Sequence, residues 1–390
     1  MFLKKKRTYL DTAAGVAGNP SSPHQEGREA KKILEEARTT IARLIEVQPD
    51  DVIFTSGATE SNALAILGYV RAVRLRSRPD APGRNNMHVL YLPSSHASIV
   101  ENVKMLEEEG VTIEALPIKE YRVDTETLAK MIRPETVLIS MDAVCGETGV
   151  VWNTREVAEI VRKAPTGVAA QSSHTRGRAL LHIDASQAPL SEKITRDHFG
   201  ADLLTFDGAK VGAMHGCGVL ILHRTIPLVP LYRGGGQERS VRPGTEAPEL
   251  AQKFAEALRA ASVGREVFRV SAVRDRARLI TRIKGAIPEV SINEGRVQAP
   301  HIFNLSLPSR DTDYLVALLD EAGFGVSTRS ACESDSEEGS RAVLVLTGDP
   351  HKAHATVRIS WGPNATPHDF DRFAEAFVRQ VAFIDSGGQR

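Results

Sequence analysis

The chain alternates short apolar runs with segments of helical periodicity, and this alternation limits its possible folds more than any other feature. Helical spacing of apolar residues appears first at residues 26–45 and again after most of the apolar runs. The runs themselves occupy residues 52–54, 89–92, 111–116, 137–141, 180–183 and 203–206. Strands that alternate with helices predict an α/β fold, in which helices cover both faces of a mostly parallel sheet.

Polar side chains follow four of these runs, at the point where each predicted strand ends. These side chains belong to His96, Glu147, Asp184 and Lys210. Because active sites of such sheets lie at the carboxyl ends of the strands, we expect the four side chains to share one site. Four polar residues at the ends of strands are more than we expect from the ordinary composition of loops.

Lys210 lies in a turn between two apolar runs and is surrounded by small residues. Taken alone, it reads as an ordinary surface lysine in a loop. An amine that is poorly solvated or near another cation loses its proton more readily, and a neutral amine can form a Schiff base with an aldehyde. Its position at a predicted strand end favours the second interpretation.

The segment from Thr55 to Asn62 joins the run 52–54 to a predicted helix at residues 63–73. Glycine and hydroxyl side chains lie at the start of this helix, which is a favourable place for an anion. A simple N-cap box explains the same residues equally well. From this segment alone, both interpretations stand.

The pattern changes after residues 242–245. Helical periodicity covers residues 248–261 and 270–287, strand-like runs cover 301–307, 325–330 and 356–361, and a last helix is expected at 367–384. We expect a large domain at residues 13–250 and a smaller α+β domain at residues 251–390. Residues 1–12 are expected to form an arm that packs on the small domain.

Composition excludes several classes of protein. Lys and Arg together number 49, as do Asp and Glu, so we expect no direct high-affinity binding of nucleic acid. The three cysteines lie far apart without metal-ligand spacing, which argues against a disulfide framework or a metal site and fits a reducing compartment. No apolar run reaches membrane-spanning length and no secretory signal is recognisable, so we expect a cytoplasmic protein that does not enter a membrane.

Six motifs resemble those of the cysteine desulfurases, in the NifS/IscS branch of the class V aminotransferase superfamily. They follow the family's order and span nearly the whole chain: Gly18-Asn-Pro-Ser-Ser22, Phe54-Thr-Ser-Gly-Ala-Thr-Glu-Ser-Asn62, His182-Ile-Asp-Ala-Ser-Gln187, Asp207-Gly-Ala-Lys210, Arg242-Pro-Gly-Thr245 and Ser330-Ala-Cys332. This resemblance implies fold type I, with a mostly parallel seven-stranded sheet in the large domain, and pyridoxal 5'-phosphate (PLP) as the cofactor.

The resemblance also implies roles for the residues that bind the cofactor ring. Lys210 would bind the PLP aldehyde and move the substrate Cα proton, and Asp184 would keep the pyridine nitrogen protonated. His96 would stack on the ring, and Gln187 would donate a hydrogen bond to the ring oxygen. Asp184 as a strand-end cap and His96 as a simple helix N-terminal residue are the structural alternatives.

Further roles follow for the phosphate and the substrate. Backbone N–H groups of Ala58 and Thr59 would hold the phosphate, and Thr245 would reach it from a partner subunit, which implies a homodimer. Arg358 would bind the substrate carboxylate bidentately, unless it is an ordinary surface cation.

Cys332 lies in a hydrophilic segment and matches the family's sulfur-accepting cysteine. Its thiolate would attack the sulfur of L-cysteine, and the resulting persulfide would pass to an acceptor protein, with L-alanine as the second product. The pathway stays open between iron–sulfur assembly, tRNA thiolation and a different use of the sulfur. Cys145 and Cys217 lie in or beside apolar runs and are expected to be inert.

The sequence departs from the family's pattern at several points. The segment before Gly18 is shortened, Gly146 replaces an asparagine that helps to hold the ring oxygen, and Met214-His215 replaces Pro-Lys. The usual Ser-Gly-His-Lys reads Asp207-Gly-Ala-Lys, which places a carboxylate near the phosphate. Asp207 could turn away, pair with Arg242 or His215, or stay protonated, and weaker PLP retention is the resulting hypothesis.

Two other functions compete with desulfuration. One is a different reaction in the same superfamily, such as that of a selenocysteine lyase, an aminotransferase or an epimerase. The other is a degenerate, non-catalytic member that serves as a partner-binding scaffold. Lys210 argues against a scaffold, and Cys332 in its polar segment favours the desulfurase over both.

Overall fold

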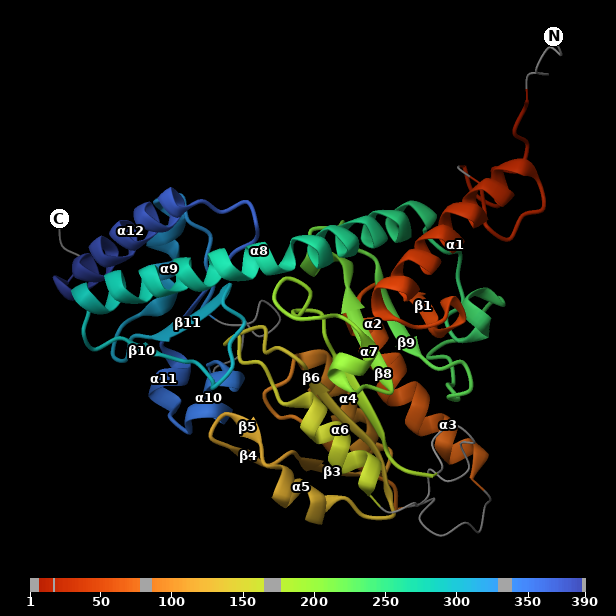
Figure 1. Cartoon of the computed structure of the whole chain (residues 1–390), viewed down its shortest axis with the longest axis horizontal. Coiled ribbons are helices and arrows are strands. Elements are labelled where there is room, and N and C mark those ends of the chain that lie inside the picture. The colour runs from red at the N-terminus through yellow and green to blue at the C-terminus, as the bar shows by residue number, and fades with distance from the viewer. Residues whose placement is uncertain (1–6, 17, 78–85, 165–176, 329–338, 388–390) are drawn as a thin grey trace.

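The computed structural model describes residues 7–16, 18–77, 86–164, 177–328 and 339–387 (Figure 1). Cys332, Arg329 and Ser330 therefore lie outside the described residues. Two bodies of secondary structure are joined by one long helix, α8, which runs from the body on the left to the body on the right in Figure 1. No described helix combines the length and the apolar character that a membrane span requires.

The larger body is built on a seven-stranded sheet. Its strands lie in the order β1 (Val52–Thr55), β9 (Gly218–Leu222), β8 (Leu203–Asp207), β7 (Leu180–Asp184), β6 (Thr136–Asp142), β2 (His88–Tyr91) and β3 (Thr112–Ala115). The five strands from β8 to β3 pair in parallel, and β9 runs antiparallel to β8 and β1. The predicted α/β fold with a mostly parallel sheet is confirmed.

Helices cover both faces of this sheet, as the continuous apolar runs of its central strands require. Alternate residues of β9 show this directly, because Val219 and Ile221 enter one core and Leu220 and Leu222 enter the other. The first core is covered by α1 (Gln25–Ile45), α5 (Thr125–Met131), α6 (Thr154–Lys163), α7 (Arg196–Phe199) and the first half of α8. The second core is covered by the helical segment after β1 and by α4 (Ala97–Glu108).

The helical segment after β1 begins earlier than the expected start at residue 63. It consists of α2 (Ala58–Ala63), a π-helical turn (Leu64–Gly68) and α3 (Tyr69–Arg76). The hydroxyl-rich residues after Gly57 form its first turn instead of a loop, since Ser61 donates its backbone N–H to the Gly57 carbonyl at 3.1 Å. The candidate anion-binding turn thus lies directly at the end of β1.

Helix α8 (Pro248–Ala286) is one helix of 39 residues, whereas two helices at 248–261 and 270–287 were predicted. Its first half packs on the first sheet through Phe254 and Leu258, and its second half packs on the other body through Leu279 and Ile283. In the middle of the helix Val263, Val267 and Val270 are exposed, so the apolar residues there do not form one buried stripe although the helix continues. The spacing of apolar residues reflects which face of a helix is buried. It therefore does not reveal the part of a helix that bridges two cores.

The second body contains a three-stranded antiparallel sheet in the order β10 (Ser291–Ile292), β11 (Ile302–Ser306) and β12 (Thr356–Ser360). Its helices are α9 (Thr312–Glu321), α10 (Arg341–Thr347), α11 (Pro350–His354) and α12 (Pro367–Asp385). The prediction of a strand at 325–330 is wrong for the residues described. Residues 325–328 form only an isolated bridge, between Ser327 and Arg358. A small hairpin of β4 (Ile118–Lys119) and β5 (Arg122–Val123) completes the strands of the described chain.

The described part of the N-terminal arm lies beside the start of α1. Arg7 pairs with Glu26 at 2.7 Å, and the Tyr9 ring meets the His24 ring edge-on at 5.4 Å between centroids. In Figure 1 this arm lies at the opposite end of the molecule from α12. Its observed contacts therefore differ from the expected packing on the small domain.

Candidate active site

A cavity of about 260 Å³ lies at the carboxyl ends of β6, β7 and β8. It is lined by most of the residues that the sequence singles out: Ala58, Thr59, His96, Glu147, Asp184, Gln187, Lys210 and Arg358. Thr245 is exposed and does not line this cavity, and Cys332 lies outside the described residues. The prediction that polar side chains converge at these strand ends is confirmed.

Lys210 lies on a short 3-10 turn, Gly208–Val211, that follows β8. The turn can pack closely because Gly208 has no side chain: a Cβ there would lie 2.9 Å from the Cys217 carbonyl oxygen and 3.2 Å from the Phe254 ring. Within the described ranges, no group accepts a hydrogen bond from the Lys210 Nζ. Its amine is therefore available to a ligand in the cavity.

Asp184 is the last residue of β7 and is buried, with a relative exposure of 6%. The Ser186 backbone N–H donates to its Oδ1 at 2.9 Å, and the Asn62 side-chain amide donates to its Oδ2 at 2.7 Å. Hydrogen bonds to both oxygens fix the orientation of the carboxylate. A buried, oriented anion is what a protonated ring nitrogen requires.

A chain of hydrogen bonds connects the buried Asp184 to His96. Asn62 also donates to the Ser98 Oγ at 2.9 Å, and Ser98 Oγ lies 2.8 Å from the His96 Nδ1. The Ser98 backbone N–H donates to the same Nδ1 at 3.2 Å, so the neutral imidazole carries its proton on Nε2. Asn62 and Ser98 were not predicted as site residues, although Asn62 ends one of the recognised motifs.

Asp142 is a second buried carboxyl that the sequence reasoning missed. It is the last residue of β6, it is paired in register with Asp184, and its relative exposure is 5%. Burial raises its pKa from 3.8 to about 7; the Ser95 hydroxyl, which donates to Oδ1 at 2.6 Å, opposes the rise, and the charge of Asp184 adds to it. Its position after the apolar run 137–141 was the one signal in the sequence.

Gly146 stands where the family's turn has an asparagine, and the Gln187 side chain lies against it. A Cβ built on Gly146 would lie 3.1 Å from the Gln187 Nε2, so the Gln187 side chain occupies the room that a larger residue would need. The Gly146 carbonyl accepts a hydrogen bond from the Arg358 Nη1 at 3.2 Å. This contact holds the Arg358 guanidinium at the wall of the cavity.

Asp207 faces the predicted phosphate donors. Its Oδ2 accepts the Ala58 N–H at 3.1 Å, and its Oδ1 accepts the Ala209 N–H at 2.9 Å. Of the expected alternatives, turning away and pairing with Arg242 are both wrong, since Arg242 pairs instead with Glu60 at 3.1 Å. Of the two N–H groups predicted to bind the phosphate, that of Ala58 therefore already donates a hydrogen bond to the Asp207 carboxylate.

The two described cysteines are buried. Burial raises the pKa of the Cys145 thiol and of the Cys217 thiol to about 12. Both stay protonated at neutral pH, so neither is a nucleophile. The expectation that they are inert is confirmed.

A larger cavity of about 1050 Å³ adjoins the first one. The two share Gly146, Gln187, Lys210 and Arg358, and the larger cavity extends along α8 to Trp361. The Lys210 amine can therefore be reached from the α8 side as well as from the strand ends.

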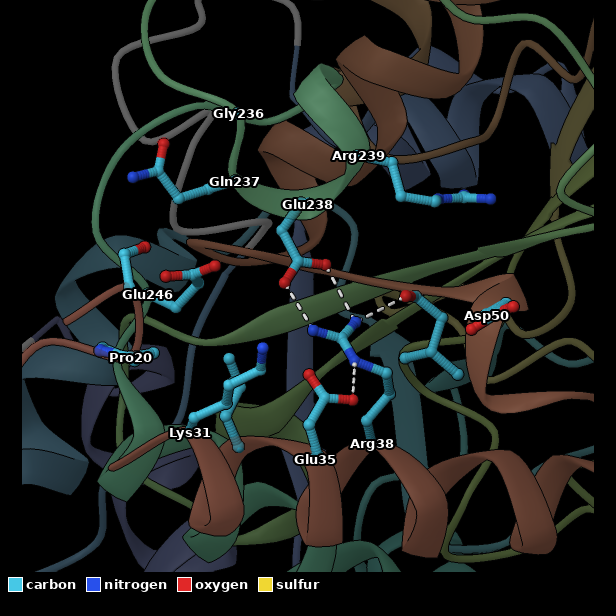
Figure 2. Close-up of a pocket in the computed structure, with 13 residues that line it drawn as sticks. Pro20, Lys31, Glu35, Arg38, Asp50, Gly236, Gln237, Glu238, Arg239 and Glu246 are labelled. Carbon is cyan, nitrogen blue, oxygen red and sulfur yellow. Dashed lines mark hydrogen bonds and ion pairs between the residues drawn. The ribbon is translucent and has the colours of Figure 1, made fainter. Parts of the chain in front are cut away.

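A further cavity of about 500 Å³ lies between α1 and residues 236–246, away from the residues above (Figure 2). Figure 2 shows Arg38 between Glu35 and Glu238; Arg38 binds Glu238 bidentately at 2.6 and 2.9 Å. The Phe54 N–H donates to the same Glu238 carboxylate at 2.9 Å. This buried pair ties the 236–246 segment to β1, directly before the turn that reaches the active-site cavity.

Glu238, Arg239 and Ser240 all have left-handed backbone conformations, with φ of 43°, 59° and 63°. Such conformations cost on the order of 1 kcal/mol or more for residues with a side chain. The bonds of Glu238 to Arg38 and Phe54 offset this cost. We regard this cavity as part of the scaffold of the site.

Comparison with known proteins agrees with this geometry. Residues 3–373 match the class-V aminotransferase family. The cysteine desulfurase IscS 1 of Archaeoglobus fulgidus is 32% identical over 362 residues, which cover 92% of this chain and 88% of that protein. The cysteine desulfurase IscS of Dictyoglomus turgidum is 31% identical, with 97% and 95% covered.

Solved structures show the same similarity. A NifS-like protein superimposes with a TM-score of 0.81 at 25% identity, covering 94% of this chain and 92% of the other. DndA of Streptomyces lividans superimposes with a TM-score of 0.72 at 29% identity, covering 91% and 94%. From its sequence, its fold and the residues gathered at its strand ends, the chain belongs to the class-V aminotransferase family and, within it, to the cysteine desulfurases.

Proposed function

We propose that the chain is a PLP-dependent cysteine desulfurase that converts L-cysteine to L-alanine and passes the sulfur from Cys332 to an acceptor protein. One observation carries the proposal. Lys210, Asp184, His96 and Arg358, which come from four separate segments, line one cavity at the carboxyl edge of the sheet. This set provides an amine, an oriented anion, an imidazole and a carboxylate-binding cation.

The residues at the ring end of the cavity fit PLP. Ser94 and Ser186 line the cavity, and their buried hydroxyl oxygens have no hydrogen-bond partner among the described residues, which indicates room for a polar ligand. Asp184 would face the pyridine nitrogen, His96 and Gln187 would hold the ring, and Lys210 would bind the aldehyde. When bound, the cofactor supplies an electron sink for charge that develops at the substrate Cα.

The phosphate end departs from the family. Ala58 and Thr59 line the cavity as expected, but the Ala58 N–H already donates to Asp207. We therefore propose that Ala58 contributes little to phosphate binding here.

Each remaining residue has a task that follows from its contacts. Arg358, held by the Gly146 carbonyl, would bind the carboxylate of L-cysteine. The Lys210 Nζ would take the Cα proton. The Asn62 amide keeps Asp184 in place and, through Ser98, orients the His96 imidazole.

The sulfur-transfer step is proposed for Cys332. Its thiolate would attack the sulfur of the substrate, so that a sulfur–sulfur bond forms while the substrate carbon–sulfur bond breaks. The electron pair of the broken bond stays with the carbon, which is then protonated to give L-alanine. The persulfide on Cys332 would next transfer its outer sulfur to the acceptor.

The assembly and cellular setting belong to the same proposal. Thr245 is exposed and lies outside the lining of its own cavity, which supports its expected action in a partner subunit of a homodimer. We also propose a cytoplasmic location. Because α8 packs on both cores, we propose that the boundary between the two domains falls within α8.

The test is to incubate the purified protein with PLP, L-cysteine and a thiol reductant, which reduces the persulfide and releases its outer sulfur as sulfide, and to measure sulfide and alanine. Both products should appear in equal amounts, and both should vanish in Lys210→Ala, while Cys332→Ser should lose sulfur transfer. Cys217→Ala, which removes a buried thiol, is the matched control and should retain activity. A Schiff-base absorbance band without sulfide would favour another class V reaction, and the absence of both would favour a non-catalytic scaffold.

A further inference from the structure

The end of β8 places Asp207 against the first turn after β1. Asp207 is paired in register with Gly218 on β9, and a Cβ on Gly218 would lie 2.7 Å from the backbone of Gly57. The missing side chain lets the Gly57–Ala58 turn pack directly on the sheet end. The Asp207 carboxylate is thereby held beside the Ala58 N–H.

The Asp207 carboxylate resembles a bound anion in its contacts. It accepts two backbone N–H groups, those of Ala58 and Ala209, and it forms no ion pair with any described residue. The nearby cation Arg242 is committed to Glu60, which also accepts the Ser56 N–H at 2.6 Å and the Tyr232 hydroxyl at 2.8 Å. Phosphate oxygens seek the same kind of backbone donor that Asp207 already uses.

The charges around the cavity add to this effect. Besides Asp142, whose raised pKa leaves it only partly charged at neutral pH, the lining carries three carboxyl groups, on Glu147, Asp184 and Asp207, and three basic side chains, on Lys210, Arg341 and Arg358, so it offers no excess of positive charge to a phosphate. A phosphate dianion placed beside Asp207 would meet a like charge and would lose the Ala58 donor. Both effects weaken phosphate binding.

We propose that the Asp207 carboxylate is an internal anion that takes the place of the cofactor phosphate beside the Ala58 N–H. The phosphate group then adds little to cofactor affinity, and the chain binds pyridoxal, the dephosphorylated form, about as well as PLP. The inference rests on the proposed function only in taking this cavity as the site of a pyridoxal-type cofactor. In chemical terms, the ligand class is an aromatic aldehyde whose side arm need not be charged.

The test compares two ligands on matched variants. The cofactor-free protein, Asp207→Ser and the control Asp197→Ser are each titrated with PLP and with pyridoxal, and the Schiff-base absorbance is followed. Serine keeps a side-chain oxygen that can cap the Ala209 N–H but removes the charge. Asp197 is an exposed carboxylate that does not line the cavity, and it controls for the loss of one negative charge.

We expect similar dissociation constants for PLP and pyridoxal in the wild type and in Asp197→Ser. In Asp207→Ser, PLP should bind at least about tenfold more tightly than before, while pyridoxal should be unchanged. A strong preference for PLP in the wild type, or the same preference in all three proteins, would overturn the proposal. Asp207→Asn, which is isosteric and uncharged, replaces the serine variant if the latter does not fold.

Inorganic phosphate provides a readout that needs neither Lys210 nor an aldehyde. Thermal melting of the cofactor-free proteins is compared in phosphate and in chloride at equal ionic strength. Phosphate should stabilise Asp207→Ser alone, and equal stabilisation of the wild type would contradict the inference. If no protein forms a Schiff base with either aldehyde, the proposed function fails, and the phosphate result alone still decides the role of Asp207.

Discussion

Asp142 offers the sharpest test of the electrostatics of the cavity. It is buried beside Asp184, and its pKa rises from 3.8 to about 7 because burial disfavours the charged form. A rise of this size corresponds to about 4 kcal/mol of folding free energy, at roughly 1.4 kcal/mol for each pH unit. Asp142→Asn removes the titration while keeping the shape of the side chain and an acceptor for the Ser95 hydroxyl.

The direction in which stability changes with pH follows from the protonation form of Asp142 that the folded state prefers. Because the folded pKa is raised, the stabilisation is complete below the unfolded value of 3.8 and is lost as the pH rises through about 7. The wild type should therefore lose stability relative to Asp142→Asn with rising pH. Over the range from about pH 5 to about pH 8, the difference between the two proteins should change by roughly 3 kcal/mol.

Urea unfolding of the cofactor-free proteins at several pH values measures this difference. All other titrating groups are common to both proteins, so their contributions cancel to first order. Asp197→Asn, at an exposed position, should give a profile parallel to that of the wild type. Parallel profiles for the wild type and Asp142→Asn would refute the assignment of a raised pKa to Asp142.

Three further outcomes are expected. Asp184→Asn should lower kcat by at least about a hundredfold, since a neutral amide cannot hold the ring nitrogen protonated, while circular dichroism should show an intact fold. Arg358→Lys should raise KM for L-cysteine by about tenfold or more and change kcat less, because a lysine cannot bind the carboxylate bidentately. Glu238→Gln should lower the free energy of unfolding by about 1–3 kcal/mol, since Arg38 loses its buried carboxylate partner and keeps only the more exposed Glu35, and the double variant with Arg38→Met should be more stable than Glu238→Gln alone.

Sequence periodicity predicted those parts of the site that depend on a single element. Asp184 and Lys210 follow apolar runs, and a parallel sheet brings such strand ends together, so the sequence alone was enough to predict their convergence. His96 was found for the same reason. These predictions needed only the period of the strands and the rule for where such sheets bind ligands.

Contacts between distant segments could not be predicted in the same way. Asn62 reaches Asp184 across 122 residues of sequence, and Asp207 reaches Ala58 across 149. Whether the Asp207 carboxylate turned away, paired with Arg242 or capped the Ala58 N–H depended on how closely Gly57 packs on Gly218. That packing is a property of the assembled sheet.

Asp142 was missed for a different reason. It ends an apolar run, as Asp184 does, but only the register of β6 with β7 reveals that the two carboxyls are neighbours. The raised pKa depends chiefly on burial in the assembled protein, which no local sequence pattern reports. Paired carboxyls at adjacent strand ends are therefore worth examining whenever a parallel sheet is predicted.

The measurement that tests the central claim most directly is mass spectrometry of the Cys332 peptide. The protein is loaded with PLP, mixed with L-cysteine in the absence of reductant, alkylated and digested. We predict that the Cys332 peptide gains the mass of one sulfur atom, that the Cys145 and Cys217 peptides do not, and that Lys210→Ala abolishes the gain. Release of alanine with no added sulfur on Cys332 would contradict the account.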